Sequence, residues 1–229
     1  METIVITGAN RGIGLELARY FLAEGKRVIA GCRDPKTAEA LAALAVSEDI
    51  EVYKLDVADD ASVAEFCARV GMETVDVLIN NAGIMGGDKQ DLNNMDYAAW
   101  LHTFNVNTLG PFRLATCLLP NLKRAARPRI VTISSQMGAF GLQMGTGSYA
   151  YRSSKSAVSK VMQVLALQLK GDNIIVCPVH PGWVRTDMGG THAEVPASES
   201  AAGLGRLIGK MTMEQSGRFW TWEGVEHTW

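Results

Sequence analysis

The sequence predicts an α/β protein built on a doubly wound parallel sheet with helices on both faces. Short runs rich in β-branched residues alternate with longer helical patterns, as in repeated strand–helix units. These runs are apolar without clean alternation, which indicates strands covered on both faces. A glycine-bearing turn joins the first run to the first helix. We therefore expect a Rossmann-type fold, and because no linker or repeat interrupts it, residues 1–229 are expected to form a single domain.

The elements follow one another in a regular order. The expected strands are 3–7, 27–31, 50–57, 75–83, 129–135, 174–182 and, at the end, 217–222. The expected helices run from the glycine turn to about Glu24, then over 36–45, 61–70, roughly 95–124, 149–170 and 198–213.

Composition excludes several classes of function. A net charge of −2 gives no electrostatic footprint for nucleic acid or an anionic membrane, and no apolar run is long enough to span a bilayer. The N-terminus lacks the pattern of a signal peptide. The four widely spaced cysteines favour reduced thiols and, with the few scattered histidines, indicate no metal site. We expect a cytoplasmic protein.

The stretch "VITGANRGIG" joins the first strand to the first helix. Glycines in such a turn let the main chain approach a pyrophosphate, which the helix N-terminal amides then bind. A glycine-rich turn without any ligand is the alternative. The expected coenzyme-binding residues of this turn are Gly8, Asn10, Arg11, Gly12, Ile13 and Gly14.

The end of the second strand bears on the choice between NAD and NADP. A carboxylate there selects NAD, whereas a base accommodates the 2′-phosphate of NADP. Arg33 is such a base, with an ordinary solvated arginine as the alternative, and Arg11 is placed to help it. Asp34 precedes Pro35, a pattern typical of a helix N-cap, so we assign it a structural role. The sequence favours NADP(H), with NAD(H) as the alternative.

The third and fourth strands end in further candidate coenzyme contacts. Asp56 and Val57 are placed to hold the adenine edge, although Asp56 is also a plausible helix cap. In "NNAG", Asn80 is expected to brace the fold. The segment formed by Asn81, Ala82 and Gly83 is expected to pass close to the coenzyme.

The stretch "YAYRSSK" contains the candidate acid–base group. Tyr151 and Lys155 are four residues apart and so share a helix face, whereas Tyr149 lies about 240° from Lys155 around a helix. The charge of Lys155 is expected to lower the pKa of Tyr151, which would make the phenol a general acid. An exposed Tyr–Lys neighbour pair is the alternative.

The fifth strand ends in "TISSQMG", at the sheet edge where ligands bind in open α/β folds. A serine hydroxyl there is placed to bind a substrate oxygen, or else to cap the next turn. Ser134 and Ser135 face opposite sides of a strand, and the residues by themselves do not choose between them.

Together, "TGANRGIG", "NNAG", "VNTLGPF", "ISS", "YRSSK" and "HPGWVRTDM" resemble the motifs of the short-chain dehydrogenase/reductase family. The resemblance covers essentially the whole chain. It is strongest to the branch of short carbonyl reductases that includes the C-factor signalling protein and sniffer-type reductases.

The resemblance implies a role for each matching residue. Tyr151 would exchange the proton, Lys155 would lower its pKa and bind the nicotinamide ribose, and Ser135 would polarise the substrate oxygen. Asn107 would hold a water that links Lys155 to solvent, whereas Asn105 would be only a mid-helix polar residue. The remaining implied residues shape the turn or hold the carboxamide: Pro181, Gly182, Val184 and Thr186.

One feature departs from the family pattern. Ser135 and Tyr151 are 16 residues apart, which is longer than usual in the family, and the additional residues fall in the glycine-bearing stretch "AFGLQMGTGS". A lengthened loop can absorb them. The departure therefore affects the pocket wall more than the chemistry.

Apolar residues near the expected site indicate an apolar or aromatic carbonyl compound, and a short substrate loop over about 184–198 indicates an open site. The sequence thus predicts a carbonyl reductase or alcohol dehydrogenase. A dinucleotide-binding regulatory protein of C-factor type, with incidental turnover, is the alternative. A Ser–Lys hydrolase is disfavoured because no "GxSxG" elbow occurs. Family members often pair through the helices that correspond to 95–124 and 149–170, which implies a homodimer or homotetramer.

Overall fold

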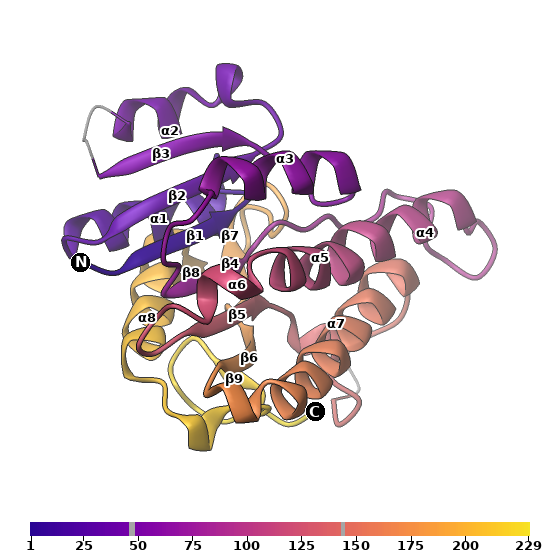
Figure 1. Cartoon of the computed structure of the whole chain (residues 1–229). Coiled ribbons are helices and arrows are strands. Elements are labelled where there is room, and N and C mark those ends of the chain that lie inside the picture. Colours follow the sequence, from indigo (N-terminus) through magenta and orange to yellow (C-terminus); the bar gives the residue numbers. More distant parts are fainter. Residues whose placement is uncertain (46–48, 143–144) are drawn as a thin grey trace.

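The computed structural model describes residues 1–45, 49–142 and 145–229. In this part of the chain, seven parallel strands form one sheet in the order β3-β2-β1-β4-β5-β6-β9, and helices cover both of its faces (Figure 1). The predicted Rossmann-type α/β fold is therefore confirmed. The strands of this sheet are β1 (Thr3–Thr7), β2 (Arg27–Cys32), β3 (Ile50–Lys54), β4 (Val77–Asn80), β5 (Arg129–Ile133), β6 (Ile175–His180) and β9 (Trp220–Thr221).

The helices segregate into two layers. One hydrophobic core lies between the sheet and the layer that contains α1 and α8, and a second lies between the sheet and the layer that contains α3, α5 and α7. The described helices are α1 (Gly12–Ala23), α2 (Glu39–Leu44), α3 (Asp60–Val70), α4 (Tyr97–Phe104), α5 (Gly110–Cys117), α6 (Leu119–Leu122), α7 (Tyr149–Gln168) and α8 (Ala197–Lys210). None of them is long and apolar enough to cross a membrane.

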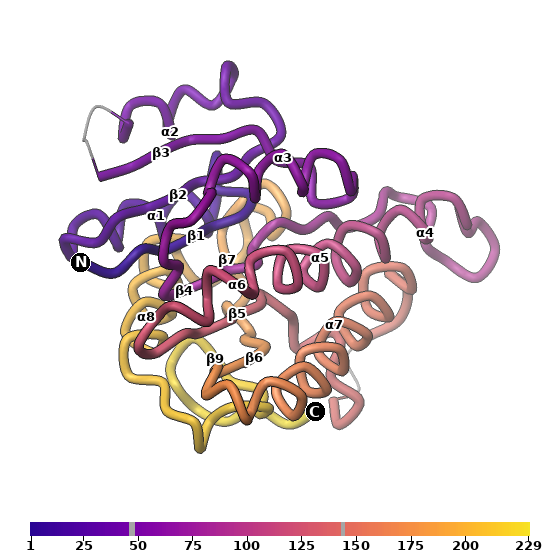
Figure 2. Tube along the Cα trace, in the orientation of Figure 1, coloured from indigo at the N-terminus to yellow at the C-terminus, as the bar shows by residue number. Residues whose placement is uncertain are grey.

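The strand order places the site. Strand β1 pairs in parallel with both β2 and β4, so the chain winds outward in opposite directions from the centre of the sheet. The tube in Figure 2 shows the consequence: the segments that follow β1, β4 and β5 emerge at one edge of the sheet. The short strands β7 (Val184–Arg185) and β8 (Val195–Pro196) form a separate pair within the predicted substrate loop.

The prediction of one long helix over 95–124 is wrong in detail. Helices α4 and α5 are joined by one turn of π-helix, Asn105–Leu109, and α6 follows after a break at Leu118. π-Turns are frequent at functional sites because they re-aim a side chain that regular helix would place elsewhere. Here the turn contains both Asn105 and Asn107.

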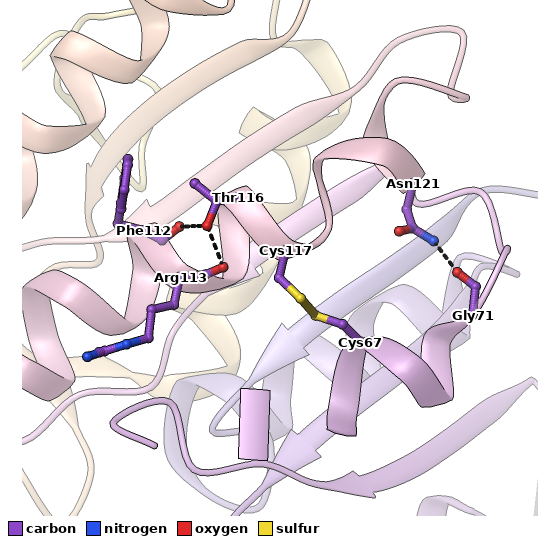
Figure 3. Close-up of a disulfide and its surroundings, with 7 residues drawn as sticks. All are labelled: Cys67, Gly71, Phe112, Arg113, Thr116, Cys117 and Asn121. Atoms are coloured by element: carbon purple, nitrogen blue, oxygen red, sulfur yellow. Dashed lines mark hydrogen bonds between the residues drawn. A yellow bond between two sulfur atoms is a disulfide. The ribbon is translucent and has the colours of Figure 1, made fainter. Parts of the chain in front are cut away.

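The expectation of four reduced thiols is wrong for two of them. Cys67 on α3 and Cys117 on α5 form a disulfide that joins the two helices (Figure 3). Their distant positions in the sequence hid this pairing, which exists because the two helices lie side by side on the sheet. Cys32 and Cys177 are buried free thiols.

Gln143 and Met144 belong to the predicted glycine-bearing loop and lie outside the described residues.

Candidate active site

The glycine turn after β1 takes a shape that other residues adopt with difficulty. Gly8 and Gly12 have φ angles of +63° and +55°. At Gly14 a Cβ atom would lie 2.5 Å from the side-chain nitrogen of Asn81. Helix α1 begins here, and the side chain of its N-cap residue, Arg11, makes no capping hydrogen bond. The first-turn amides thus remain available to an anion.

A residue that we did not single out from the sequence holds this turn against the end of β4. The Thr7 hydroxyl accepts hydrogen bonds from the main-chain nitrogens of Asn81 and Ala82, both at 3.0 Å. The Asn81 side chain donates to the carbonyl oxygens of Thr7 and Gly8 at 2.9 and 3.1 Å. The feature of the sequence that could have identified this role is the position of Thr7, directly before Gly8 in "VITGAN". Asn81 is therefore fully engaged in shaping the turn.

The other residues predicted for this turn lie at its edges. Asn10 is half-buried in the turn, and Ile13 packs against the core of the α1 layer. Arg11 is exposed and pairs with Asp187 of the predicted substrate loop, at 2.6 Å.

The end of β2 carries an exposed base and a capped turn. Arg33 is exposed directly after the strand. The Asp34 carboxylate accepts a hydrogen bond from the main-chain nitrogen of Lys36 at 3.1 Å and caps the turn Pro35–Thr37. This confirms the structural role predicted for Asp34, and Arg33 is the exposed base beside it.

Asp56 and Val57 lie at the end of β3, beside the helix that carries Asn107. The Asp56 carboxylate accepts from the main-chain nitrogen of Ala58 at 2.9 Å, so it orders the turn that precedes α3. Asp59, rather than Asp56, caps α3. Val57 is buried, and a Cβ on Gly110 would lie 2.9 Å from its Cγ2 atom.

Asn107 is held where the β4 turn meets α7. Its side chain accepts from the main-chain nitrogen of Ile84 and donates to the carbonyl oxygen of Ile84, each at 2.9 Å. It also donates to the Ser154 hydroxyl at 3.0 Å. A Cβ on Gly83 would lie 3.3 Å from the Asn107 side-chain oxygen and 3.5 Å from Lys155 Nζ. The structure thus brings Gly83, Asn107 and Lys155 together. Asn105, by contrast, donates to Ala58.

The two serines after β5 have different surroundings. Ser134 is buried, and its hydroxyl bonds Ser159 at 2.7 Å and the main-chain oxygen of Lys155 at 3.2 Å. Ser135 instead caps the following turn by accepting from the main-chain nitrogen of Met137 at 3.2 Å, and it also bonds the Tyr151 phenol. Only Ser135 is thus shared between the strand end and the tyrosine.

Tyr151 and Lys155 lie on one face of α7, as the four-residue spacing predicts. Lys155 Nζ is 5.7 Å from the centre of the Tyr151 ring and donates to the carbonyl oxygen of Ile133 at 2.7 Å. Both side chains are buried. Tyr149 begins the same helix on another face, where it lines a surface hollow of about 340 Å³ with Trp100 and Arg152.

The electrostatics differ from the expectation that Lys155 lowers the pKa of Tyr151. Burial raises the pKa of Tyr151 above its usual value, and the hydrogen bond with Ser135 offsets only part of that increase. Burial also lowers the pKa of Lys155 to about 8. The prediction was wrong for the protein without coenzyme, because removing both groups from water disfavours phenolate and ammonium alike.

The segment after β6 closes the site from the other side. Gly182 has a φ of +89°, and Pro181 accepts a hydrogen bond from the Ser200 hydroxyl at 2.6 Å. The Thr186 hydroxyl donates to the carbonyl oxygen of Val184 at 3.4 Å. A Cβ on Gly12 would lie 3.1 Å from Thr186 Cγ2, so this segment and the glycine turn face each other.

The residues present fit a dinucleotide. The uncapped start of α1 and the bare main chain at Gly12 suit a pyrophosphate, and Gly83 leaves room beside Lys155 that a side chain would fill. A sheet that opens its strand ends between a glycine turn and a buried tyrosine–lysine pair is that of a dinucleotide-dependent oxidoreductase.

The comparisons with known proteins agree. The family model described as short chain dehydrogenase matches residues 2–196, and the chain belongs to the short-chain dehydrogenase/reductase family. It is 40% identical over 164 residues to the C-signal protein of Myxococcus xanthus, a match that covers 72% of this chain and 98% of that protein.

Two solved structures share the whole fold. The carbonyl reductase Sniffer of D. melanogaster superposes with a TM-score of 0.95 at 31% identity, covering 100% of both chains. A carbonyl reductase from chicken fatty liver, crystallised with NADPH bound, superposes with a TM-score of 0.93 at 32% identity, covering 100% of this chain and 99% of that one.

Proposed function

We propose that this protein is an NADP(H)-preferring carbonyl reductase or alcohol dehydrogenase that can also accept NAD(H). The observation that carries the proposal is the meeting of Ser135, Tyr151 and Lys155 at the strand ends, opposite the glycine turn. When bound, the coenzyme supplies or accepts a hydride at its nicotinamide ring.

In this proposal four side chains share the catalytic work. The Ser135 hydroxyl binds the substrate oxygen and orients the carbonyl group. The Tyr151 phenol donates its proton to that oxygen, or takes the proton back from an alcohol. Lys155 binds the nicotinamide ribose, and its ammonium favours the phenolate once both are in a closed site. Asn107, held against Ile84, orders the path by which the proton returns to Lys155.

The coenzyme contacts form a continuous path along the strand ends. The residues that we propose for it are Gly8, Asn10, Arg11, Gly12, Ile13 and Gly14 of the turn, Arg33, Asp56 and Val57, Asn81 to Gly83, and Pro181, Gly182, Val184 and Thr186. NADPH bound to the chicken liver relative supports the choice of coenzyme. The exposed Arg33 and the cap role of Asp34 point in the same direction.

The central test is a panel of aldehydes and ketones assayed with NADPH. We expect the wild type to reduce at least some of them and Tyr151→Phe to lose kcat by about 10²–10⁴-fold, the usual contribution of a general acid. Tyr149→Phe is the matched control, because Tyr149 lies on another face of α7 and should keep its rate. Wild-type turnover in Tyr151→Phe would disprove the assignment.

The coenzyme preference is tested by binding. Fluorescence titration should give a lower Kd for NADPH than for NADH, and Arg33→Ala should narrow the difference. Equal affinity of the wild type for both coenzymes would contradict the assignment of Arg33 to the coenzyme site.

A regulatory role is the second candidate, and the similarity to the C-signal protein favours it. Tight coenzyme binding without turnover across the panel would support this role over the enzymatic one.

We propose that the substrate is an apolar or aromatic carbonyl compound received at the open 184–198 segment. Exposed Trp183 and Met188 support this choice.

We also propose a cytoplasmic location and a homodimer or homotetramer. Cell fractionation with thiol trapping tests the location, because a cytoplasm keeps most thiols reduced. Recovery in the cytoplasmic fraction supports the proposal, and recovery elsewhere with the Cys67–Cys117 disulfide intact contradicts it.

A further inference from the structure

The last residues of the chain lie against the segment that follows Ser135. The Gly141 main-chain nitrogen donates to the main-chain oxygen of Trp229 at 2.6 Å. A Cβ on Gly141 would lie 2.9 Å from the Thr228 hydroxyl oxygen and 3.0 Å from the Trp229 oxygen. The two segments are thus in main-chain contact, although they are far apart in sequence (Figure 2).

A second contact reaches the beginning of the same segment. The Gln136 main-chain nitrogen donates to His180 Nδ1 at 3.4 Å, and the buried His180 ring lies 5.7 Å from the ring of His227. The Phe219 ring, 1% exposed, lies 4.7 Å from His227 and 5.9 Å from Trp229. The end of the chain is therefore anchored on the core, and it contacts the 136–141 segment directly at Gly141 and through His180 at Gln136.

The other side of the segment packs on α7. A Cβ on Gly138 would lie 2.6 Å from the main-chain nitrogen of Ser156, and the Ser156 hydroxyl donates to the carbonyl oxygen of Gly138 at 2.7 Å. Residues 136–141 are thus held between α7 and the chain end. Ordering such a segment costs conformational entropy, which contacts on both of its sides offset.

We propose that residues 227–229, together with His180, position the 136–141 segment as one wall of the carbonyl pocket and so determine how bulky a substrate the site accepts. The inference rests on the proposed reductase function. None of these residues takes part in proton or hydride transfer. They act through the segment that begins one residue after Ser135.

Two single substitutions test the contact between residues 227–229 and the 136–141 segment without shortening the chain. Gly141→Ala introduces a methyl group into the contact with Thr228 and Trp229, and Trp229→Ala removes the ring that lies beside Phe219. Gly209→Ala is the matched control, because a Cβ there would meet nothing within 4 Å.

The first readout is hydrogen exchange of the 136–142 peptide, which requires no activity. Both test variants should exchange faster by about tenfold, and the control should match the wild type. Unchanged exchange in both variants would show that the chain end does not hold the segment.

The second readout is the split between KM and kcat for two aldehydes that differ in bulk, 2-naphthaldehyde and propanal. We expect KM for 2-naphthaldehyde to rise by about threefold or more in the test variants, with kcat and KM for propanal within about twofold of the wild type. Faster exchange with an unchanged KM ratio would overturn the specificity role. A wild type that reduces neither aldehyde nor any other carbonyl compound would overturn the reductase function and with it the specificity role. The exchange readout would still test whether residues 227–229 hold the 136–141 segment.

Discussion

At the scale of single residues, the site combines two groups whose charged forms burial disfavours. Lys155 is buried and donates to Ile133, and Tyr151 is buried beside Ser135. Burial shifts the pKa of the lysine downward and that of the tyrosine upward, so each group is held closer to its neutral form.

The lysine makes stability depend on pH. The unfolded chain keeps the Lys155 proton to about pH 10.5, whereas the folded protein releases it near pH 8. Between these values the unfolded state binds more protons, so the contribution of Lys155 to the free energy of unfolding rises with pH. Relative to Lys155→Met, the wild type should gain about 1–2 kcal/mol between pH 8 and 9.5 in urea titrations.

The control for this prediction is Lys160→Met, since Lys160 is exposed on the same helix. That variant should follow the wild-type slope. Tyr151 does not interfere, because its raised pKa keeps the phenol protonated throughout the range. A flat difference between the wild type and Lys155→Met would contradict the assignment.

At the scale of elements, α3 is linked to α5 and to the α6 turn that follows it by a disulfide, an ion pair and a hydrogen bond. The Cys67–Cys117 disulfide joins the two helices directly, and Arg113 of α5 forms an ion pair with Asp60 of α3. Asn121 of α6 adds a hydrogen bond to the main-chain oxygen of Gly71, just after α3, at 2.9 Å (Figure 3). Helix α5 continues from the π-turn that holds Asn107. The ties therefore stabilise the layer on which one side of the site is built.

Breaking the disulfide should destabilise the fold. The two cysteines are 50 residues apart, and closing a loop of this size in the unfolded chain contributes about 2–4 kcal/mol. Cys117→Ser should lower the free energy of unfolding by that amount in non-reducing urea titrations. In reductant, the wild type and the variant should unfold together. A wild-type midpoint that reductant leaves unchanged would count against the link.

At the scale of the whole molecule, two adjacent helices carry exposed apolar side chains. Tyr97 and Leu101 on α4 are 71% and 74% exposed, and Val164 and Leu167 on α7 are 51% and 73% exposed. Large exposed apolar side chains gathered on neighbouring helices are candidates for association sites. It supports the proposal of a homodimer or homotetramer that pairs through these helices.

Charges on this surface should separate the subunits. Light scattering should give an oligomeric mass for the wild type and a monomeric mass for the Leu101→Glu, Leu167→Glu double variant, because a buried unpaired carboxylate opposes association. Met72→Glu, at an equally exposed site beyond the end of α3, should leave the mass unchanged. A monomeric wild type at micromolar concentration would refute the proposal.

Much of the fold was predictable because its causes are local. Apolar β-branched runs, helical periodicity and the glycines of the first turn specify strands, helices and their order without knowledge of distant contacts. The facing of Tyr151 and Lys155 was predictable for the same reason, since four-residue spacing on a helix sets it. The cap role of Asp34 followed from its position before Pro35.

Other features depended on which distant segments become neighbours. The disulfide between α3 and α5, the brace of Asn81 by Thr7 and the contact of Trp229 with Gly141 all join elements that only packing brings together. The pKa directions of Tyr151 and Lys155 likewise reflect burial, which the spacing of two residues does not reveal. The sequence by itself determined the order of the elements and the face on which the candidate acid–base pair lies. Tertiary structure decided how deeply that pair is buried and what surrounds it, because burial is a property of the whole packed chain.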